Sequence, residues 1–161
     1  VKECRKIKDH PLAELKAHEN VGYLSADGKK HNSYQCSVPR HLVDQSFWLP
    51  WTLRLAAKHW AGGDNRSLRL RTWEGHFDAH DLWINFAYKN DDNPRHNHAG
   101  LLSGVIFYQN HNHPVLFDEY RCGYSGENGT MVLFPSQVLH HVEKQVMNKE
   151  RITFAFNIIK T

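Results

Sequence analysis

Gly129-Thr-Met-Val-Leu-Phe-Pro-Ser-Gln-Val-Leu-His140-His-Val142 and Arg151-Ile-Thr-Phe-Ala-Phe-Asn157 are the two runs that decide the fold. β-Branched and aromatic residues dominate both, and Pro-Ser interrupts the first, which is typical of strand, turn and strand. Alternation along the second run predicts one shared face, looking into a barrel, for Arg151, Thr153, Ala155 and Asn157. The stretch therefore predicts two strands, one bearing a potential metal ligand, His140, and the other a potential carboxylate clamp.

Arg151 is the residue of the second run with the clearest chemical implication. Its planar guanidinium suits a bidentate grip on a carboxylate, and its burial in a barrel is compensated only if an anion meets it. In the alternative interpretation, Arg151 pairs with Glu143 or Glu150 on the rim of the barrel. The sequence leaves both interpretations open.

Short β-type runs continue upstream of this stretch. They are separated by clusters of Gly, Asn, Asp and Pro, at the spacing of an all-β sandwich or barrel. The predicted strands are 68–73, 82–88, 102–108, 115–117, 130–134, 140–146 and 152–159. We expect a mainly β fold with N-terminal helices, built as a double-stranded β-helix, which is a cupin-like jelly roll.

The N-terminal third has a helical pattern instead. One helix is predicted over about 9–19, and a loop rich in Gly, Asn and Ser follows to about Pro39. A second helix is predicted over 41–61, with Pro50 as an N-terminal or kinking residue. Gly62-Gly63 is expected to end it.

The chain has 161 residues, which is the length of about one domain. Because no linker separates the helical and β parts, we expect a single domain, with helical support over about 1–62 and a jelly-roll core over about 66–161. No apolar run approaches the roughly 20 residues of a membrane span, so no membrane insertion is expected. The chain starts at Val1 rather than Met, so residues before Val1 are expected to be missing.

The cysteines and the net charge limit the cellular location and the partners that can be expected. Cys4, Cys36 and Cys122 are odd in number and scattered, with no C-x-x-C pair, which argues against a disulfide framework and a thiolate zinc site. We therefore expect reduced cysteines and a cytoplasmic location. The net charge is +3, but the basic residues are spread along the chain, so a nucleic-acid partner is only weakly indicated.

Thirteen histidines are many for this length, and imidazole is a common ligand of transition metals. Four groupings compete as ligands. They are His96-Asn-His98, His111-Asn-His113, His76-Phe-Asp78 and His140-His141. In an extended segment alternate residues point the same way, so both imidazoles of an H-x-H pair can face one ion.

Strand spacing separates these groupings. A jelly roll places a proximal pair and a distal His on adjacent strands, with about four strands between them in the chain, each of roughly five residues. The segment from His98 to His140 is long enough, whereas that from His113 is too short and begins at what looks like a hairpin tip. His76 with Asp78 stays open as an alternative, because a carboxylate suits iron(II). His141 should point outward.

Taken together, these runs resemble the iron(II)- and 2-oxoglutarate-dependent oxygenases, and most closely an oxygenase group found in bacteria and phages. The motifs that carry the resemblance are Trp83-Ile-Asn85, Asn93-Pro-Arg-His96-Asn-His98, Ser103-Gly-Val-Ile-Phe-Tyr108, Phe134-Pro-Ser136 with His140-His-Val142, and Arg151-Ile-Thr-Phe-Ala-Phe-Asn157. The group's own pattern has Ser-Gly-Val-x-Tyr-Tyr in the third motif and Arg-Ile-Ser in the last. The resemblance covers about half of the chain, from residue 83 onward.

The resemblance implies an enzyme that holds iron(II) and couples oxidative decarboxylation of 2-oxoglutarate to succinate with hydroxylation of a substrate. His96, His98 and His140 would be the metal ligands, and no further catalytic residue is implied. The departure from the usual pattern is His98, which stands where the family has an aspartate. Three neutral imidazoles would make the metal site more positive than two histidines and a carboxylate.

The resemblance also implies a cosubstrate site. Arg151 would bind the distal carboxylate of 2-oxoglutarate, helped by Thr153, and Tyr108 would hydrogen-bond the same cosubstrate. Asn85 would be a further polar group of this site. Asn157 and Trp83 are expected in the substrate pocket, and O2 is the other reactant.

Two other function classes remain as alternatives. A cupin-type thiol dioxygenase also uses three histidines, but its first motif has a Glu that this chain lacks, and it has no need for Arg151. A jelly-roll binding module without turnover is the third possibility. The substrate is unidentified; family analogy favours a protein or peptide side chain over a small molecule or nucleobase.

Overall fold

The computed structural model describes residues 17–18, 34–38, 43, 48–64, 66–73, 76–80 and 82–161. Among these residues, one α-helix has described bounds, α4 (Trp48–Trp60), beside thirteen β-strands, and Val43 is also helical. The strands are β1 (Ala17–His18), β2 (Tyr34–Ser37), β3 (Leu68–Leu70), β4 (Thr72–Trp73), β5 (His76–His80), β6 (Leu82–Ala87), β7 (Asn93–His96), β8 (Leu102–Gln109), β9 (Val115–Phe117), β10 (Cys122–Tyr124), β11 (Met131–Pro135), β12 (His140–Val142) and β13 (Arg151–Lys160).

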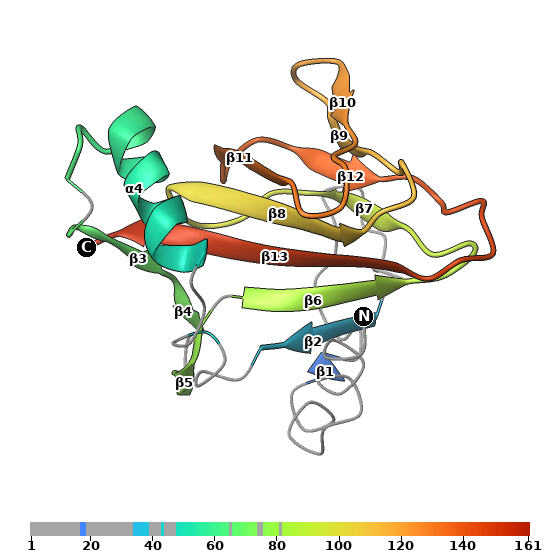
Figure 1. Ribbon diagram of the computed structural model, residues 1–161, viewed down its shortest axis with the longest axis horizontal. Helices are drawn as coiled ribbons and strands as arrows, with labels where there is room; N and C mark the ends of the chain where they lie inside the picture. The colour runs from blue at the N-terminus through green and yellow to red at the C-terminus, as the bar shows by residue number, and fades with distance from the viewer. Residues whose placement is uncertain are drawn as a thin grey trace.

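Two antiparallel sheets carry the fold (Figure 1). The larger has the order β1-β2-β6-β13-β8-β11, with β3 also paired to β13. The smaller has the order β10-β9-β12-β7, and β4 and β5 form a separate two-stranded sheet. Strands from distant parts of the chain alternate between the two sheets, as in a double-stranded β-helix. The predicted jelly-roll fold is confirmed.

The central strand β13 is buried on both faces, so its pattern is nearly continuous rather than alternating. One face carries Ile152, Phe156 and Ile158, each with no exposed surface, and packs into the core beneath α4. The other face carries Arg151 and Thr153, which are buried between the two sheets. The shared face predicted from alternation is therefore present, and it looks inward.

Helix α4 covers the outer face of the large sheet. Thr52, Ala56 and Ala57 are its buried residues, and the ring of Trp48 lies 5.4 Å from that of Phe156 on β13. Pro50 falls in its first turn, where the missing N–H has no intrahelical partner to lose. The predicted helix is thus confirmed over Trp48–Trp60.

The end of α4 is built by glycine as predicted. Gly62 and Gly63 both have positive φ (64° and 86°), and the Gly63 N–H donates to the carbonyl of Ala57 at 2.8 Å. This bond satisfies a carbonyl that the helix end would otherwise leave open. It turns the chain sharply toward β3.

Other predicted boundaries need correction. Ala17 and His18, the described part of the helix predicted over 9–19, form strand β1; the rest of that prediction lies outside the described residues. Residues 34–37 were predicted as loop but form β2, which pairs with β6. The predicted strand 140–146 ends at Val142. In each case pairing with a distant strand overrides the local pattern.

The predicted strand 68–73 is divided at Arg71. The backbone N–H of Arg71 donates to the carbonyl of Asn157 at 2.9 Å, at the point where β3 leaves β13. Beyond it, β4 turns away to pair with β5, which was not predicted. Strands β7 and β10 were not predicted either, because both are short and rich in polar residues.

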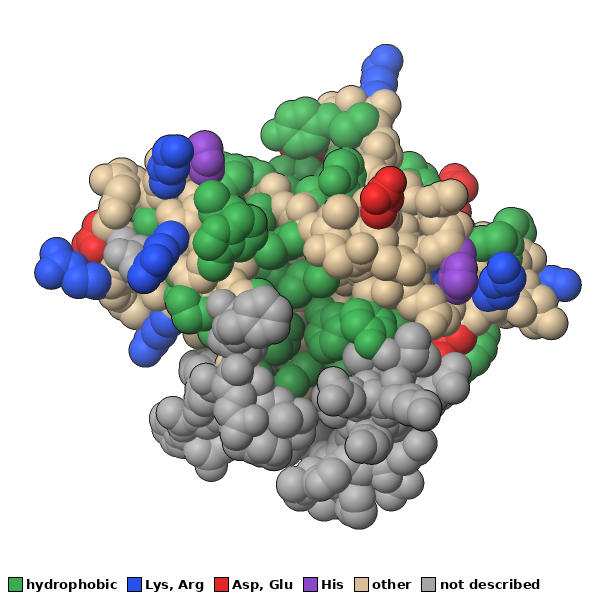
Figure 2. Space-filling view, in the orientation of Figure 1, with side chains coloured by type: hydrophobic (Ala, Val, Ile, Leu, Met, Phe, Trp, Pro, Cys, Tyr) green, Lys and Arg blue, Asp and Glu red, His purple; other side chains and the backbone are tan. Residues whose placement is uncertain are grey.

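The surface matches the scattered charge of the sequence. On the face drawn in Figure 2, Lys and Arg side chains lie apart toward the edges, and apolar side chains occupy the centre. No helix in the described part of the chain is long and apolar enough to cross a membrane.

Gly104, in the middle of β8, is required by the packing of Phe156. A Cβ atom at residue 104 would lie 2.2 Å from the ring of Phe156, which has no exposed surface in which to move. We therefore expect Gly104→Ala to lower the free energy of unfolding by about 1–3 kcal/mol, the usual cost of overpacking. Chemical denaturation of the metal-free protein measures this.

Gly123→Ala is the matched control, because residue 123 is exposed on β10. Its new Cβ would meet Cδ2 of Leu116 at 2.6 Å and Cβ of Pro114 at 3.3 Å, and both of these side chains are only half-buried. Equal destabilisation by the two substitutions would contradict the packing role of Gly104.

Candidate metal centre

Three histidines from different parts of the chain converge between the two sheets. His96 is the last residue of β7 and His140 the first of β12, and the two are directly opposite in the antiparallel register. His98 follows β7, where its backbone N–H donates to the carbonyl of Ser136 at 2.8 Å. One ring nitrogen from each of the three lies within 4.8 Å of the others. Strands β8, β9, β10 and β11 intervene between His98 and His140, as the spacing argument required.

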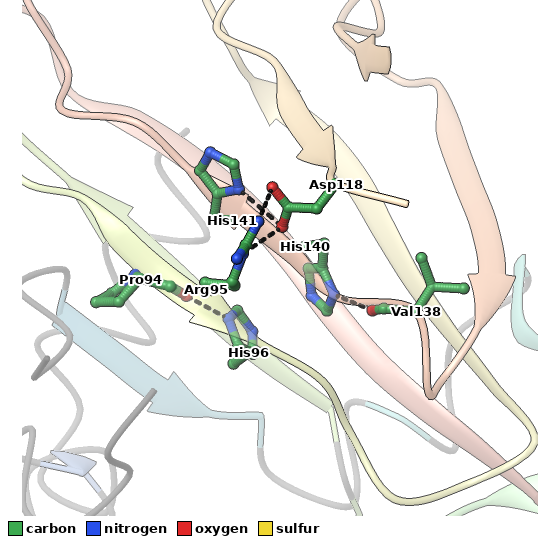
Figure 3. Close-up of polar contacts among 7 residues, drawn as sticks. All are labelled: Pro94, Arg95, His96, Asp118, Val138, His140 and His141. Carbon is green, nitrogen blue, oxygen red and sulfur yellow. Dashed lines mark hydrogen bonds and ion pairs between the residues drawn. The ribbon is translucent and has the colours of Figure 1, made fainter. Parts of the chain in front are cut away.

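Backbone carbonyls set the tautomers of two of these rings. Nδ1 of His96 lies 2.6 Å from the carbonyl of Pro94, and Nδ1 of His140 lies 2.9 Å from that of Val138 (Figure 3). Because a carbonyl oxygen only accepts, each Nδ1 carries the hydrogen and each Nε2 is the unprotonated nitrogen, the form that can bind a metal. This second hydrogen bond is the arrangement that metal-ligating histidines usually have.

His140 is held neutral by its surroundings. It is 4% exposed and packs against the ring of Phe134, with the centroids 4.7 Å apart. Burial, with a smaller contribution from His96, lowers its pKa to about 3. A neutral imidazole is the form that binds a metal, so His140 is ready to act as a ligand at neutral pH.

The three rings suit a divalent transition metal. Imidazole nitrogens are good ligands for iron, zinc, copper and nickel, and three protein ligands leave coordination positions open for other molecules. The donor set therefore fits the iron(II) that the sequence resemblance implies, without excluding the other metals.

Arg151 lines the same cavity as the three histidines. It is 4% exposed, and among the described residues it forms no ion pair with Glu143 or Glu150, the partners of the surface alternative. Its Nε donates to Oδ1 of Asn110 at 2.8 Å, and its Nη2 is buried without a hydrogen-bond partner. Burial lowers its pKa to about 10, which still leaves the side chain cationic at neutral pH. A buried, uncompensated guanidinium is a site for an anion.

Seven of the nine predicted site residues line this one cavity. They are Trp83, Asn85, His96, His98, His140, Arg151 and Thr153. Within it, Trp83 donates from Nε1 to Oδ1 of Asn85 at 3.1 Å, and Asn85 donates from Nδ2 to the Thr153 hydroxyl at 3.3 Å. The Trp83 ring lies 5.5 Å from that of His98. A hydrogen-bonded row thus runs along the wall between the histidines and Arg151.

The structure does not bring Tyr108 to the cavity. Its ring packs edge-on against Phe154, with the centroids 5.8 Å apart, on the outer side of the large sheet. Strand alternation places Phe107 inward instead, so where the family pattern has two adjacent tyrosines, the inward position here has no hydroxyl. The phase of β8 therefore decides on which side of the sheet the Tyr108 ring lies.

Asn157 does not line the cavity either. It is 2% exposed, lies on the inward face of β13 opposite Ser103, and accepts a hydrogen bond from the Ser103 hydroxyl at 2.6 Å. That contact ties β13 to β8 and occupies the side-chain oxygen. The structure therefore favours a role for Asn157 in packing rather than in contact with a substrate.

The competing histidines have other partners. His111 and Asn112 have positive φ (54° and 59°) in the turn between β8 and β9, and the Nε2 atoms of His111 and His113 contact the carbonyls of Glu150 and Glu143. The predicted turn is present, but it is not a hairpin tip, because β8 and β9 do not pair and lie in different sheets. His76 and Asp78 lie on β5, where the side chains are outside the described set, so this alternative is not tested.

His141 points to the other side of the small sheet, as alternation required. Its Nδ1 donates to Asp118 at 3.3 Å, and Asp118 also receives two bonds of 2.8 Å from Arg95 (Figure 3). The hydrogen bond from Arg95 is the largest influence that holds the pKa of Asp118 below its usual value.

Three further residues around the cavity were not predicted from the sequence. Asn110 contacts Arg151, and the side-chain oxygens of Asn93 and Gln145 are buried without partners in the cavity wall. Asn93 opens the motif Asn93-Pro-Arg-His96, but it was given no role in the site. Asn110 and Gln145 belong to no motif, and the available signal for Asn110 was that it directly follows the Ser-Gly-Val strand.

The chain was compared with protein families and with curated proteins. Residues 109–157 match the family model described as "Putative 2OG-Fe(II) oxygenase". No curated protein matches the chain.

Solved structures resemble the whole chain in fold. An oxidoreductase of the 2OG-Fe(II) oxygenase family from Burkholderia pseudomallei is 16% identical, with a TM-score of 0.65 over 100% of this chain and 80% of that one. A Pseudomonas putida prolyl-4-hydroxylase is 17% identical, with a TM-score of 0.61 over 99% and 83%. The non-heme alpha ketoglutarate dependent epimerase SnoN from nogalamycin biosynthesis is 11% identical, with a TM-score of 0.55 over 99% and 70%. At these identities the likeness concerns the fold alone.

The fold and the site together define a jelly-roll protein with a three-histidine group able to hold a metal. The match to the oxygenase family model is confined to residues 109–157, and the likeness to solved structures over the whole chain concerns the fold.

The depressed pKa of His140 predicts acid lability of the metal-free protein. Between the ordinary histidine pKa of about 6.5 and the folded value of about 3, the unfolded state binds a proton that the folded state does not. Stability should therefore fall as the pH drops through this window, by up to about 1.4 kcal/mol per pH unit from this residue.

Urea unfolding at several pH values checks this, with wild type compared with His140→Gln. The variant should lose less stability between pH 6.5 and 3 than wild type. His59→Gln, an exposed position on α4, controls for removing a histidine. Parallel pH profiles for wild type and His140→Gln would contradict the buried neutral state.

Proposed function

We propose that the protein is an iron(II)- and 2-oxoglutarate-dependent oxygenase that couples decarboxylation of 2-oxoglutarate to hydroxylation of a substrate. The observation that carries the proposal is the buried Nη2 of Arg151, which has no hydrogen-bond partner and lies in the same cavity as three convergent imidazoles. A metal site and an anion site in one cavity suit a ligand with a metal-binding end and a distal carboxylate. We also propose that the chain acts as one oxygenase domain.

His96, His98 and His140 would hold the iron. When bound, iron(II) supplies the redox chemistry that joins the oxidation of 2-oxoglutarate to that of the substrate, using O2. The residues themselves bring no negative charge, because all three ligands are imidazoles. The site thus keeps the full charge of the ion, which favours a dianionic cosubstrate over a neutral one.

Arg151 would bind the distal carboxylate of 2-oxoglutarate. Its Nη2 is ready to donate, and the cost of burying its charge is compensated when the anion arrives. Thr153 and Asn85 lie on the same wall and would add polar contacts along the cosubstrate. Tyr108 is left out of this site because it packs on the other face of β8.

Trp83 would border the place where substrate reaches the metal, since its ring lies beside His98. We propose a protein or peptide side chain as the substrate class, by analogy with the prolyl-4-hydroxylase that shares this fold. Succinate formation that peptides stimulate above the substrate-free rate would support this class. Stimulation by small metabolites alone would contradict it.

A three-histidine thiol dioxygenase would use the same imidazoles and is the alternative enzyme. It has no need for a buried cation, so Arg151 distinguishes the two enzymes.

The cytoplasmic location expected from the sequence also stays a proposal, supported by the free thiol of exposed Cys122.

Anaerobic titration of the iron(II)-loaded protein with 2-oxoglutarate should produce a visible charge-transfer band. In Arg151→Gln the midpoint of this titration should rise at least about 30-fold, because losing one partner of a buried charge pair costs about 2 kcal/mol or more. Arg151→Lys should restore only part of the affinity, since an ammonium cannot form the planar two-bond grip. A wild-type protein that binds iron(II) but shows no band would overturn the oxygenase proposal in favour of a thiol dioxygenase or binding module.

The ligand set is tested by His98→Ala beside Asp78→Ala. Iron(II) affinity, measured by competition with a coloured chelator, should fall in His98→Ala by more than the roughly 10- to 100-fold that loss of an outer-sphere partner costs. It should be unchanged in Asp78→Ala. If only Asp78→Ala loses the metal, the carboxylate of the His76-Phe-Asp78 motif is the third ligand and His98 is not.

A further inference from the structure

We infer that Asn110 is a positioning residue for the cosubstrate: it fixes the guanidinium of Arg151 so that its terminal nitrogens face the cavity, without neutralising its charge. The inference rests on the proposed function, because it concerns how Arg151 would receive 2-oxoglutarate. It adds a residue that the motifs of the sequence do not mark.

The contacts of Asn110 use each polar group of its side chain. Oδ1 accepts from Nε of Arg151 at 2.8 Å. Nδ2 donates to the Ser125 hydroxyl at 3.1 Å and to the carbonyl of Gly126 at 3.2 Å. Since Nδ2 faces acceptors, the amide can be placed only one way round, with Oδ1 toward Arg151. At 1% exposure, Asn110 has no water with which to replace these bonds.

The loop that holds Asn110 is itself tightly packed. The backbone N–H of Asn110 donates to Oδ1 of Asn128 at 3.0 Å. A Cβ atom at residue 126 would lie 2.0 Å from the Thr130 hydroxyl and 2.6 Å from the Phe107 ring, so only glycine fits there. The partners of Nδ2 are therefore fixed, and through them so is the Asn110 amide.

Residues on either side of Asn110 fix the backbone at the start of β13. Nε2 of Gln109 donates to the carbonyl of Glu150 at 2.5 Å, and Nε2 of His111 contacts the same oxygen at 3.0 Å. Three consecutive side chains thus bind the Glu150–Arg151 segment. Asn110 is the one that reaches the guanidinium.

The choice of a neutral amide has an electrostatic consequence. A carboxylate at residue 110 would hold Nε equally well, but it would cancel the charge that attracts an incoming anion. Asparagine orients the guanidinium and leaves that charge intact. Because Nε of Arg151 already donates to Asn110, an anion would bind to the terminal nitrogens of the guanidinium, where Nη2 has no hydrogen-bond partner.

The test compares two oxo acids in Asn110→Asp and Asn110→Ala. 2-Oxoglutarate has the distal carboxylate; 2-oxopentanoate has the same metal-binding end and nearly the same length but lacks it. Binding of each to the iron(II)-loaded protein is followed by the charge-transfer band under anaerobic conditions. Asn112→Asp, an exposed position in the adjacent turn, is the charge-matched control.

Both substitutions at residue 110 should weaken 2-oxoglutarate roughly 10- to 100-fold, the range for hydrogen bonds to charged groups. The midpoint for 2-oxopentanoate should change less than about 2-fold, and Asn112→Asp should match wild type with both acids. Unchanged 2-oxopentanoate binding also demonstrates that the variants are folded and hold iron(II).

Equal weakening of both oxo acids, or wild-type affinity for 2-oxoglutarate in both variants, would overturn the positioning role while leaving the oxygenase proposal intact. If wild type itself binds neither acid, the proposed function has failed and the inference fails with it.

Discussion

The antiparallel register between β7 and β12 is the constraint on which the site depends. It sets His140 directly opposite His96, and a slip of one residue would turn one of these rings to the other face of the sheet. The register is held from outside by the neighbours of those same two residues. Arg95 and His141 both bond to Asp118, which follows β9, so one carboxylate links three adjacent strands behind the histidines. The metal-binding face and the ion-pair face are thus two sides of one pairing.

The cavity between the sheets contains two groups that could bind a ligand, the three converging imidazoles and the guanidinium of Arg151. At one place three imidazoles converge, and burial keeps one of them, His140, from being protonated. At another, Arg151 keeps a charge that no described residue compensates with an ion pair. Burying an unpaired guanidinium is costly, and an anion placed against it would lower that cost. The cavity therefore contains one place suited to a cation, at the three histidines, and another suited to an anion, at Arg151.

Much of this could be predicted from local patterns. The strands around His140 and Arg151 follow from β-branched and aromatic runs, and the inward face of β13 follows from alternation with period two. The four strands between His98 and His140 followed from the length of the segment. These features depend on residues close in sequence, so residue type, alternation and segment length are enough to predict them.

The errors have a common cause. Tyr108 was placed in the cosubstrate site from its motif, whereas the phase of β8 turns its ring to the outer side of the large sheet, against Phe154. Strand β2 lies in a stretch rich in turn-forming residues, and only its pairing with β6 makes it a strand. Asn110 belongs to no motif, and its contact with Arg151 spans 41 residues of sequence. Each depends on a partner that the local sequence does not specify.

The sequence by itself determined the jelly-roll class, the histidines able to bind a metal and the arginine on the inward strand, because these follow from residue type and period. Only the tertiary structure decided that His96, His98 and His140 meet, that Arg151 is buried with Nη2 unpaired rather than paired on the rim, and that Asn110 holds it. The physical reason is that convergence and desolvation are properties of packing between distant segments. The two runs from Gly129 to Asn157 carry the chemistry, and the strands paired with them set its geometry.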